Sequence, residues 1–268
     1  MIRAHFGIDK NPFSHEAISL LPQQQDVLDT LKVHCQQGGF CLVMGNPGTG
    51  KSVVRETLVR MAEKRYRVAT ISRTMHTYSN TIRILCEAFG VEYSGTHFKC
   101  ERRLIEEAFA LKQSGRTAVT VLDDAHLLEM DTLRRLRLLF SDFPHTHNLI
   151  LFGQPQLLSS LSLGVYEDIK SRITYSVCTL KLGPDDMEQF LLGQMDHCGL
   201  AHSVFSPEAM GLIVRASDGI LRRARNIALS ALLEAVRARK RVVDLENVNR
   251  VLLQPHWRND QDMDKAMN

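Results

Sequence analysis

The sequence predicts an α/β fold, in which a parallel five-stranded sheet flanked by helices is followed by a small all-α lid domain. Short apolar runs alternate with amphipathic stretches up to about residue 183, and only helical patterns follow from there on. The apolar runs are continuous rather than alternating, as is typical of strands that helices cover on both faces. Strands separated by helices imply right-handed crossovers, and the sheet is therefore expected to be parallel.

The individual elements can be placed from the same patterns. The strands are expected at 40–44, 67–72, 118–122, 149–152 and 176–180. Between the strands, helical spacing of apolar residues begins at Ser52 and returns at 82–89 and 104–111. After the sheet, helices are expected at 187–197, 206–216, 221–237 and 245–253. Ser206 followed by Pro207 is a typical helix start, with the serine as the cap.

These elements divide the chain into four segments. We expect an N-terminal segment with a first helix at 1–38, an α/β core at 39–183, a helical lid at 184–255 and a disordered tail at 256–268. The boundary near 183 follows from the change of pattern after Gly183-Pro184. The tail is polar and rich in aspartate, which is typical of a disordered terminus.

The composition indicates a soluble cytoplasmic protein. Its 268 residues are 44% hydrophobic, which is enough for one substantial core and a smaller satellite domain. The net charge of +3 does not by itself indicate a nucleic-acid partner. The six cysteines lack metal-ligand spacing, so we expect reduced thiols rather than disulfides or zinc. We expect no targeting segment or membrane span, because no apolar run approaches the roughly 20 residues that a span requires.

A glycine-rich loop follows the first expected strand. Gly45, Gly50, Lys51 and Ser52 match the phosphate-loop pattern GxxxxGK[ST], with a strand before it and a helix after it. Backbone N–H groups of such a loop surround phosphate oxygens, while the lysine carries charge to the outer phosphates and the serine hydroxyl ligates magnesium. We therefore expect ATP and Mg²⁺, although no base-specific motif excludes GTP, and a chance glycine-rich turn is the alternative. The residues expected to hold the nucleotide are Asn46, Pro47, Gly48, Thr49, Gly50, Lys51, Ser52 and Val53.

Two carboxylates follow the third expected strand. The strand delivers Asp123 to the same sheet edge as the loop, where it is expected to hold magnesium through water together with Ser52. Asp124 would then orient or deprotonate the attacking water. The alternative role is a helix N-cap, because an acidic residue before Ala125 also suits that position. The place of the pair after a phosphate loop favours the magnesium role.

Four further motifs carry a resemblance to a known family. The chain contains FGIDKNPFS at 6–14, LFGQPQL at 151–157, SRI at 171–173 and GILR at 219–222. These segments resemble the motifs FGL…PF, LVGQPEL, QRI and GIPR of AAA+ ATPases. The resemblance covers about residues 3–253 and points to the ExeA/GspA-type group and to the related transposition-helper ATPases of the TnsC/TniB/MuB type.

The resemblance implies roles for three residues outside the phosphate loop. Gln154 would be the polar sensor near the γ-phosphate, and Arg222 would be the lid arginine that binds the nucleotide. Arg172 would be the arginine finger, which acts across a subunit boundary and so presupposes a homo-oligomer. The resemblance also implies that the N-terminal segment lies near the adenine pocket. Two alternatives stay open: Arg172 could pair with Asp168 across a helical turn, and Arg222 could belong to a solvated helix face.

Basic residues point to a second ligand. The resemblance to transposition-helper ATPases implies an ATP-dependent ring or filament around duplex DNA, contacted by loops after the second strand and its helix. The residues expected to contact the DNA backbone are Arg73, His76, Lys99, Arg102 and Arg103. Basic clusters are also common on solvated helix faces, which is the alternative.

Three functions are compatible with these features. We expect first an ATP hydrolase that binds DNA, regulates transposition and target selection, and recruits a transposase or another recombination protein. The alternative is a secretion-associated ATPase; that class normally carries a membrane span and a periplasmic region, whereas this sequence ends shortly after the expected lid. The third is a nucleotide-gated interaction switch with little hydrolysis. Its basis is Asp124, because the family usually has a longer Glu there and the shorter side chain predicts slow turnover.

Overall fold

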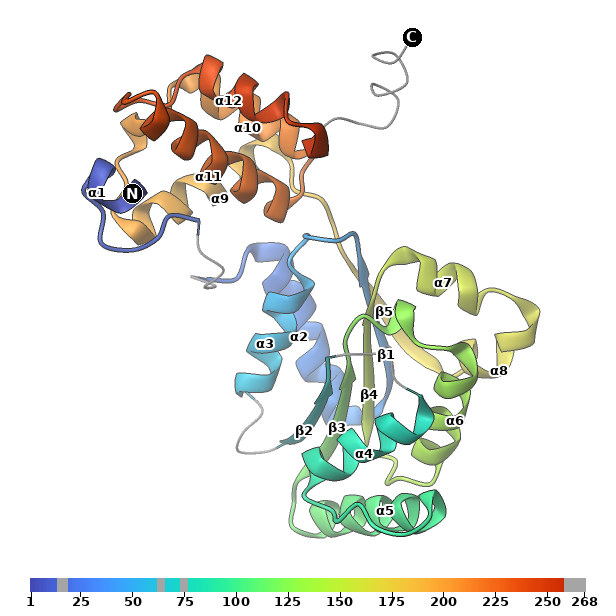
Figure 1. Cartoon of the computed structure of the whole chain (residues 1–268). Coiled ribbons are helices and arrows are strands. Elements are labelled where there is room, and N and C mark those ends of the chain that lie inside the picture. Colours follow the sequence, from blue (N-terminus) through green and yellow to red (C-terminus); the bar gives the residue numbers. More distant parts are fainter. Residues whose placement is uncertain (14–18, 62–65, 73–76, 258–268) are drawn as a thin grey trace. The chain divides into compact units, whose positions relative to one another are not determined.

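The computed structural model describes residues 1–13, 19–61, 66–72 and 77–257 of the chain. Contacts within the chain form two compact units (Figure 1). The sheet unit comprises 22–180, and the helical unit comprises 1–21 together with the chain from 181 onward. These boundaries differ from those expected at 38 and 183, and the expected division into four segments stays a prediction.

The sheet unit has the expected α/β architecture, with helices on both faces of one sheet (Figure 1). Five parallel strands lie in the order β2-β3-β4-β1-β5. They are β1 Gly39–Gly45, β2 Tyr66–Ile71, β3 Thr117–Leu122, β4 Asn148–Gly153 and β5 Ile173–Thr179. The helices are α2 Pro22–Gln37, α3 Lys51–Met61, α4 Tyr78–Phe89, α5 His97–Gln113, α6 Met130–Ser141, α7 Pro155–Leu161 and α8 Glu167–Lys170, with the 3₁₀ turns η1 Ala125–Leu127 and η2 Gly164–Tyr166. The predicted five-stranded parallel sheet is confirmed.

The strands read as continuous apolar runs because both faces of the sheet are covered. Phe40 and Leu42 of β1 belong to a core cluster with apolar side chains of α4, α5 and α6. The intervening Cys41 and Val43 are fully buried as well. Because side chains alternate along a strand, these two point to the opposite face, where α2 and α3 contact β1. The loop after β1 therefore leaves the sheet between two covered faces.

The strand β5 begins at Ile173, earlier than the expected start at 176. It lies at one edge of the sheet, next to β1 alone. Thr174, Tyr175 and Ser176 are exposed, so polar residues interrupt the apolar run that marks a strand covered on both faces. The expected start was wrong for this reason.

The helical unit contains the expected helical C-terminal region, which is confirmed. Its helices are α1 Ile2–Phe6, α9 Pro184–Cys198, α10 Pro207–Ser217, α11 Leu221–Arg237 and α12 Leu245–Leu252, with the 3₁₀ turns η3 His202–Val204 and η4 Pro255–Trp257. At the start of α10, the hydroxyl of Ser206 accepts a hydrogen bond from the backbone N–H of Ala209 at 3.2 Å. This contact is the cap that the Ser-Pro sequence predicts.

The N-terminal residues belong to the helical unit. Ile8 and Phe13 are buried in its core cluster, and the ring of Phe13 packs edge-on against Phe205 with 6.2 Å between centroids. Arg225 Nε donates to the Phe13 carbonyl at 3.3 Å. Whether this segment also lies near an adenine pocket stays a prediction.

Two expectations concern the tail and the membrane. Residues 258–268, most of the expected disordered tail, lie outside the described residues. Across the described ranges, no helix combines the length and the apolar character that crossing a membrane requires.

Candidate nucleotide site

The phosphate loop joins the end of β1 to the start of α3. Gly48 and Gly50 have φ angles of 83° and 98°, a region that favours glycine. Gly45 is required for another reason, because a Cβ atom there would lie 2.0 Å from Thr179 Oγ1 on β5. The hydroxyl of Thr49 lies 2.7 Å from that of Thr179, which ties the loop to β5. A steric or conformational constraint therefore favours glycine at each of these three positions of the loop.

Lys51 and Ser52 begin α3 directly after the loop. Lys51 Nζ donates to the carbonyl oxygens of Gly45 and Asn46, at 2.7 and 2.9 Å. Its side chain thus folds back over the loop, beside the space where a phosphate group would lie. Ser52 is exposed in the first turn of α3, at the helix end whose dipole favours anions. The expected nucleotide contacts form one continuous stretch, namely Asn46, Pro47, Gly48, Thr49, Gly50, Lys51, Ser52 and Val53.

Asp123 follows β3 and lies, like the phosphate loop, at the carboxyl ends of the strands. Its backbone N–H donates to the carbonyl of Ile71 at 2.9 Å, which continues the pairing of β3 with β2. Its carboxylate forms an ion pair with Arg55 on α3, and only 13% of the Asp123 side chain and 16% of the Arg55 side chain are exposed. Burial raises the pKa of Asp123 above its usual value of 3.8, although the Arg55 charge opposes that rise.

The residues around Asp123 fit a magnesium ion. The Ser52 hydroxyl and the Asp123 carboxylate are oxygen ligands, which magnesium prefers, and magnesium usually keeps several waters besides one or two protein ligands. The ion pair with Arg55 also demonstrates that a cation is accommodated against this carboxylate. The donor set is therefore compatible with the expected metal.

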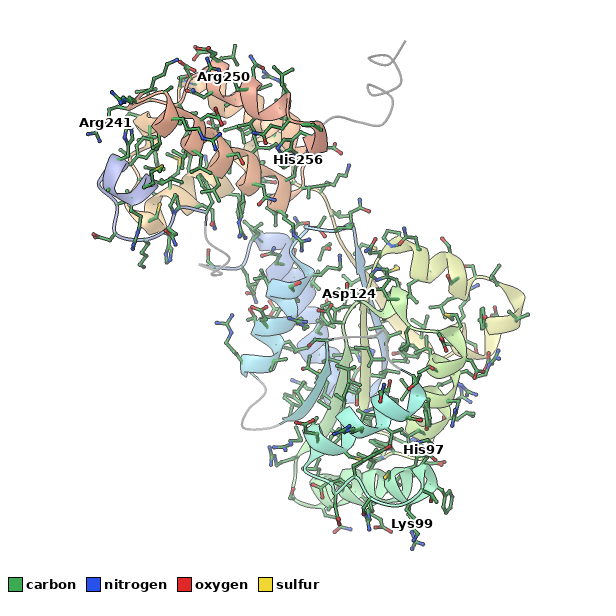
Figure 2. The ribbon with its side chains drawn as sticks, in the orientation of Figure 1. His97, Lys99, Asp124, Arg241, Arg250 and His256 are labelled. Atoms are coloured by element: carbon green, nitrogen blue, oxygen red, sulfur yellow. The ribbon has the colours of Figure 1, made fainter. Side chains whose placement is uncertain are left out.

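Asp124 follows at the start of η1, and Figure 2 shows it in the sheet unit near α3 and the ends of the strands. Its φ and ψ of 48° and 37° lie in the left-handed region, which aspartate adopts more readily than most residues. Within the described chain, its side chain makes no capping hydrogen bond to η1. The geometry therefore does not support the helix-cap alternative.

Gln154 follows β4 and stands beside a histidine that the sequence did not indicate. Gln154 Nε2 lies 2.7 Å from Nε2 of His126, which belongs to η1. The other ring nitrogen of His126 is buried and has no hydrogen-bond partner among the described residues. Gln154 and His126 thus come together from two chain segments that both leave the carboxyl ends of strands, and Asp124 lies two residues before His126 at the start of η1.

Two residues of this site, Arg55 and His126, were not expected from the sequence. Arg55 follows Ser52 by three positions on α3, so helical spacing places both on one face, and this was a usable signal. His126 reaches Gln154 only through the 3₁₀ turn η1. No pattern in the sequence marks that turn.

Arg172 lies at the amino ends of the strands, whereas the phosphate loop lies at their carboxyl ends. It directly precedes β5, and the strand register pairs Ile173 with Phe40 at the start of β1 and Thr179 with Gly45 at its end. At a rise of about 3.3 Å per residue, these pairs are about 17 Å apart along β1 and about 20 Å apart along β5. Arg172 therefore cannot reach the phosphate loop of its own subunit.

The alternative pairing of Arg172 with Asp168 is wrong. Among the described residues, the Asp168 carboxylate pairs with Arg134 and Arg137 of α6, at 3.2 and 3.6 Å. Arg222 is the second residue of α11 in the helical unit, and its side chain is exposed. Contact of Arg222 with a nucleotide stays a prediction.

The five residues expected to contact DNA divide into two groups. Arg73 and His76 lie outside the described residues. Lys99, Arg102 and Arg103 lie in the first turns of α5. Figure 2 shows Lys99 at an end of the sheet unit away from Asp124.

Two of the α5 cations have partners within their own unit. Arg102 pairs with Glu106 at 2.9 Å. Arg103 Nη1 donates to the carbonyl of Glu92 at 3.0 Å and to the hydroxyl of Ser94 at 2.8 Å. The side chains of Arg102 and Arg103 both remain partly exposed, so a ligand can still contact them.

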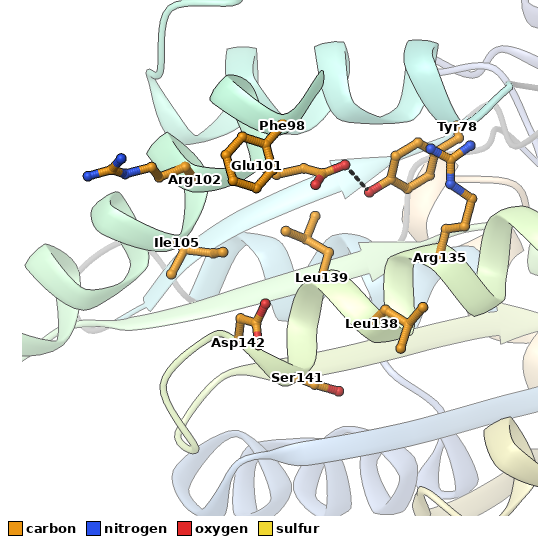
Figure 3. Close-up of a pocket in the computed structure, with 10 residues that line it drawn as sticks. All are labelled: Tyr78, Phe98, Glu101, Arg102, Ile105, Arg135, Leu138, Leu139, Ser141 and Asp142. Atoms are coloured by element: carbon orange, nitrogen blue, oxygen red, sulfur yellow. Dashed lines mark hydrogen bonds between the residues drawn. The ribbon is translucent and has the colours of Figure 1, made fainter. Parts of the chain in front are cut away.

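Figure 3 shows a pocket beside these residues, formed by α4, α5 and α6. The Tyr78 hydroxyl donates to Glu101 Oε1 at 2.7 Å, and the Arg135 guanidinium lies 3.8 Å from the Tyr78 ring centroid. Burial, together with the Glu101 carboxylate, raises the pKa of the Tyr78 hydroxyl. Glu101 and Asp142 lie among the basic residues of the pocket, so its surface carries both signs of charge.

Comparison with known proteins adds a family match and one curated relative. Residues 33–161 match the family described as AAA domain. General secretion pathway protein A of Aeromonas hydrophila is 27% identical over 245 residues, which are 88% of this chain and 45% of that protein. The chain thus spans less than half the length of this relative.

Solved structures with the same fold include a Cdc6p and an ORC1 protein. Cdc6p from Pyrobaculum aerophilum matches with a TM-score of 0.73 at 17% identity, over 91% of this chain and 70% of that one. The Aeropyrum pernix ORC1 protein, solved in complex with DNA, matches with a TM-score of 0.66 at 20% identity, over 86% and 65% of the two chains. At such identities the likeness concerns the fold alone. Residues 33–161 therefore match the AAA domain family, and the chain is similar to general secretion pathway protein A and shares the fold of the Cdc6p and ORC1 structures.

Proposed function

We propose that this chain is an ATP hydrolase whose nucleotide sites are completed between subunits of a homo-oligomer. The observation that carries the proposal is that Arg172 lies at the amino ends of the strands, opposite the ends that carry the phosphate loop. A cation that acts on the γ-phosphate from there has to serve a neighbouring subunit. Oligomer formation and ATP binding are therefore coupled in this proposal.

The roles within one site follow from the residues at the carboxyl edge of the sheet. Lys51 and the loop N–H groups bind the phosphates, while Ser52 and Asp123 hold the magnesium ion. Magnesium, when bound, neutralises charge on the β- and γ-phosphate oxygens. Asp124 orients the attacking water and takes its proton, and Gln154 binds near the γ-phosphate. Arg222 contacts the nucleotide from the helical unit, and the N-terminal segment lines the adenine pocket.

We further propose that the ATP-bound oligomer binds duplex DNA and acts as a transposition regulator that recruits a transposase. Two observations support DNA as the ligand: the fold is that of an ORC1 protein solved in complex with DNA, and α5 begins with Lys99, Arg102 and Arg103. Arg73 and His76 are proposed to join these contacts. The resemblance of the LFGQPQL, SRI and GILR motifs to transposition-helper ATPases supports the specific role.

A second function has its own support. The identity of 27% to general secretion pathway protein A extends over 88% of this chain, which favours a secretion-associated ATPase. A third form of the proposal, a nucleotide-gated switch with little turnover, is supported by Asp124 in place of the family's glutamate.

The ATPase rate with and without duplex DNA separates these functions. Stimulation by DNA is expected for the transposition regulator, and an unchanged rate would contradict it and favour the secretion role. Tight ATP binding with negligible turnover under both conditions would favour the switch. Lys51→Ala is expected to abolish ATP-dependent assembly together with turnover, measured by light scattering. Unchanged assembly of Lys51→Ala would contradict the coupling of the phosphate loop to oligomerisation.

A further inference from the structure

Two arginines of α6 hold the short helix α8, which ends just before Arg172. Arg134 Nε and Nη2 lie 3.2 and 3.3 Å from the two carboxylate oxygens of Asp168 on α8. Arg137, one turn further along α6, brings Nη2 to 3.6 Å from the same carboxylate. The planar fork of Arg134 fixes orientation as well as distance, because two nitrogens of one guanidinium face two oxygens.

Arg134 also contacts the turn η2 that leads into α8. Its Nη2 donates to the carbonyl of Val165. Its guanidinium lies 5.4 Å from the centre of the Tyr166 ring. Together with Asp168, these contacts attach one short segment to α6 at three points. An isolated exposed ion pair contributes little to stability, so the arrangement matters for where the segment lies rather than for whether the protein folds.

The segment attached in this way continues directly into Arg172. The backbone N–H groups of Ser171 and Arg172 donate to the carbonyls of Glu167 and Ile169, at 2.9 and 3.0 Å. Ile169 is fully buried in the core of the sheet unit, whereas the neighbouring Asp168 faces the arginines of α6. The backbone before Arg172 is therefore held from the inside by packing and from the outside by ion pairs.

We propose that Arg134 and Arg137, acting through Asp168, are positioning residues for Arg172. The inference rests on the proposed function, in which Arg172 completes the nucleotide site of a neighbouring subunit. A charge that stabilises a transition state has to be placed in advance, and a misplacement of about 1 Å can lower a rate by about 100-fold. Helix α6 follows η1 and Asp124 along the chain, so the same contacts join Arg172 to the segment that leaves the subunit's own site.

Assemblies that mix two variants first test the trans role of Arg172, that is, its action on the nucleotide site of a neighbouring subunit. Asp124→Asn subunits offer Arg172 but lack the group that activates water, while Arg172→Ala subunits keep Asp124 but offer no finger. Each variant alone is expected to be inactive. Their mixture is expected to regain hydrolysis at interfaces where an Arg172→Ala site meets an Asp124→Asn neighbour. An inactive mixture would overturn the trans role of Arg172 and the positioning role with it.

The contacts of α8 are then broken only in the subunit that donates the arginine. Adding Asp168→Asn to the Asp124→Asn subunit is expected to lower the regained rate by about tenfold or more. The matched control is Glu106→Gln in that subunit, which removes a likewise exposed ion pair with Arg102 on α5. Equal recovery with the Asp168→Asn and Glu106→Gln donors would overturn the inference while leaving the trans role in place.

Two further measurements separate positioning from folding. Asp168 is 39% exposed, so the thermal unfolding midpoint of Asp168→Asn is expected to match that of the parent. Arg134→Lys keeps the charge but loses the forked guanidinium. An Asp124→Asn subunit that also carries Arg134→Lys is expected to restore hydrolysis to a level between those of the Asp124→Asn subunit without a further change and the one with Asp168→Asn. Full recovery with Arg134→Lys would contradict a role of guanidinium geometry in positioning Arg172.

Discussion

The guanidinium of Arg55 on α3 is paired with the carboxylate of Asp123, the residue proposed to hold magnesium. Lys51 Nζ, in the same site, donates to the carbonyls of Gly45 and Asn46. Two cations of the chain therefore engage oxygen atoms at the place where a magnesium nucleotide is proposed to bind. Nucleotide binding is expected to rearrange both side chains.

Arg55→Met is expected to lower the magnesium concentration needed for ATP binding. Methionine keeps a long unbranched side chain but removes the charge that competes with magnesium for Asp123. Loss of an ion pair worth about 1 kcal/mol corresponds to about fivefold in half-saturation. Calorimetric titration of ATP at several magnesium concentrations measures the shift. Arg60→Met, an exposed arginine on the same helix, is the control, and a higher magnesium requirement in Arg55→Met would contradict the competition.

Asp124→Glu is expected to raise the rate of ATP hydrolysis, because the longer side chain reaches further toward the attacking water. The same change is expected to destabilise the fold by about 1 kcal/mol, since glutamate adopts the left-handed backbone less readily than aspartate. Asp124→Asn keeps the shape and is expected to abolish turnover without weakening ATP binding. Single-turnover hydrolysis and urea unfolding measure the two effects. A slower Asp124→Glu enzyme would mean that side-chain length does not limit this site.

The strands of the sheet could be predicted because burial on both faces leaves a local signature. The strands β1, β3 and β4 each begin one residue before the expected start. The edge strand β5 lacks that signature, since Tyr175 and Ser176 are exposed. Its start could not be found from an apolar run.

In the candidate site, too, some residues could be predicted from the sequence and others could not. The phosphate loop is contiguous in the chain, so a motif reveals it. Arg55 and His126 join the site through contacts with Asp123 and Gln154 that form only on folding. The place of Arg172 depends on the register of β5 against β1, and no local pattern contains that register.

His126→Ala is expected to lower the turnover number, by up to about 100-fold, while the affinity for ATP stays unchanged. The reason is that Gln154 loses the ring that holds its amide 2.7 Å from His126 Nε2, so the amide is no longer oriented before the reaction. Steady-state kinetics and nucleotide binding measure the two quantities separately. Leu127→Ala, an exposed side chain in the same turn, is the control. An unchanged turnover number in His126→Ala would exclude a role of the histidine in orienting Gln154.

His147, at the start of β4, is expected to make the sheet unit sensitive to acid. Its ring lies 3.0 Å from the Thr120 hydroxyl and stacks on Phe140 with 4.6 Å between centroids. Burial lowers its pKa from 6.5 to about 3. The folded protein therefore favours the neutral ring, while the unfolded chain takes up a proton below pH 6.5. The stabilisation is present above pH 6.5 and is lost as the pH falls toward the folded-state pKa.

Urea unfolding of the wild type and of His147→Gln checks this expectation. Between pH 6.5 and pH 5, protonation of the unfolded histidine lowers the free energy of unfolding of the wild type by about 2 kcal/mol. Glutamine does not titrate and its amide can still bond the Thr120 hydroxyl, so His147→Gln is expected to lose about 2 kcal/mol less than the wild type over this range. His145→Gln replaces an exposed histidine nearby and is expected to behave as the wild type does. An equal loss in the wild type and in His147→Gln would mean that the folded protein accepts the proton at His147, because only then does the titration of that ring cancel between the two states.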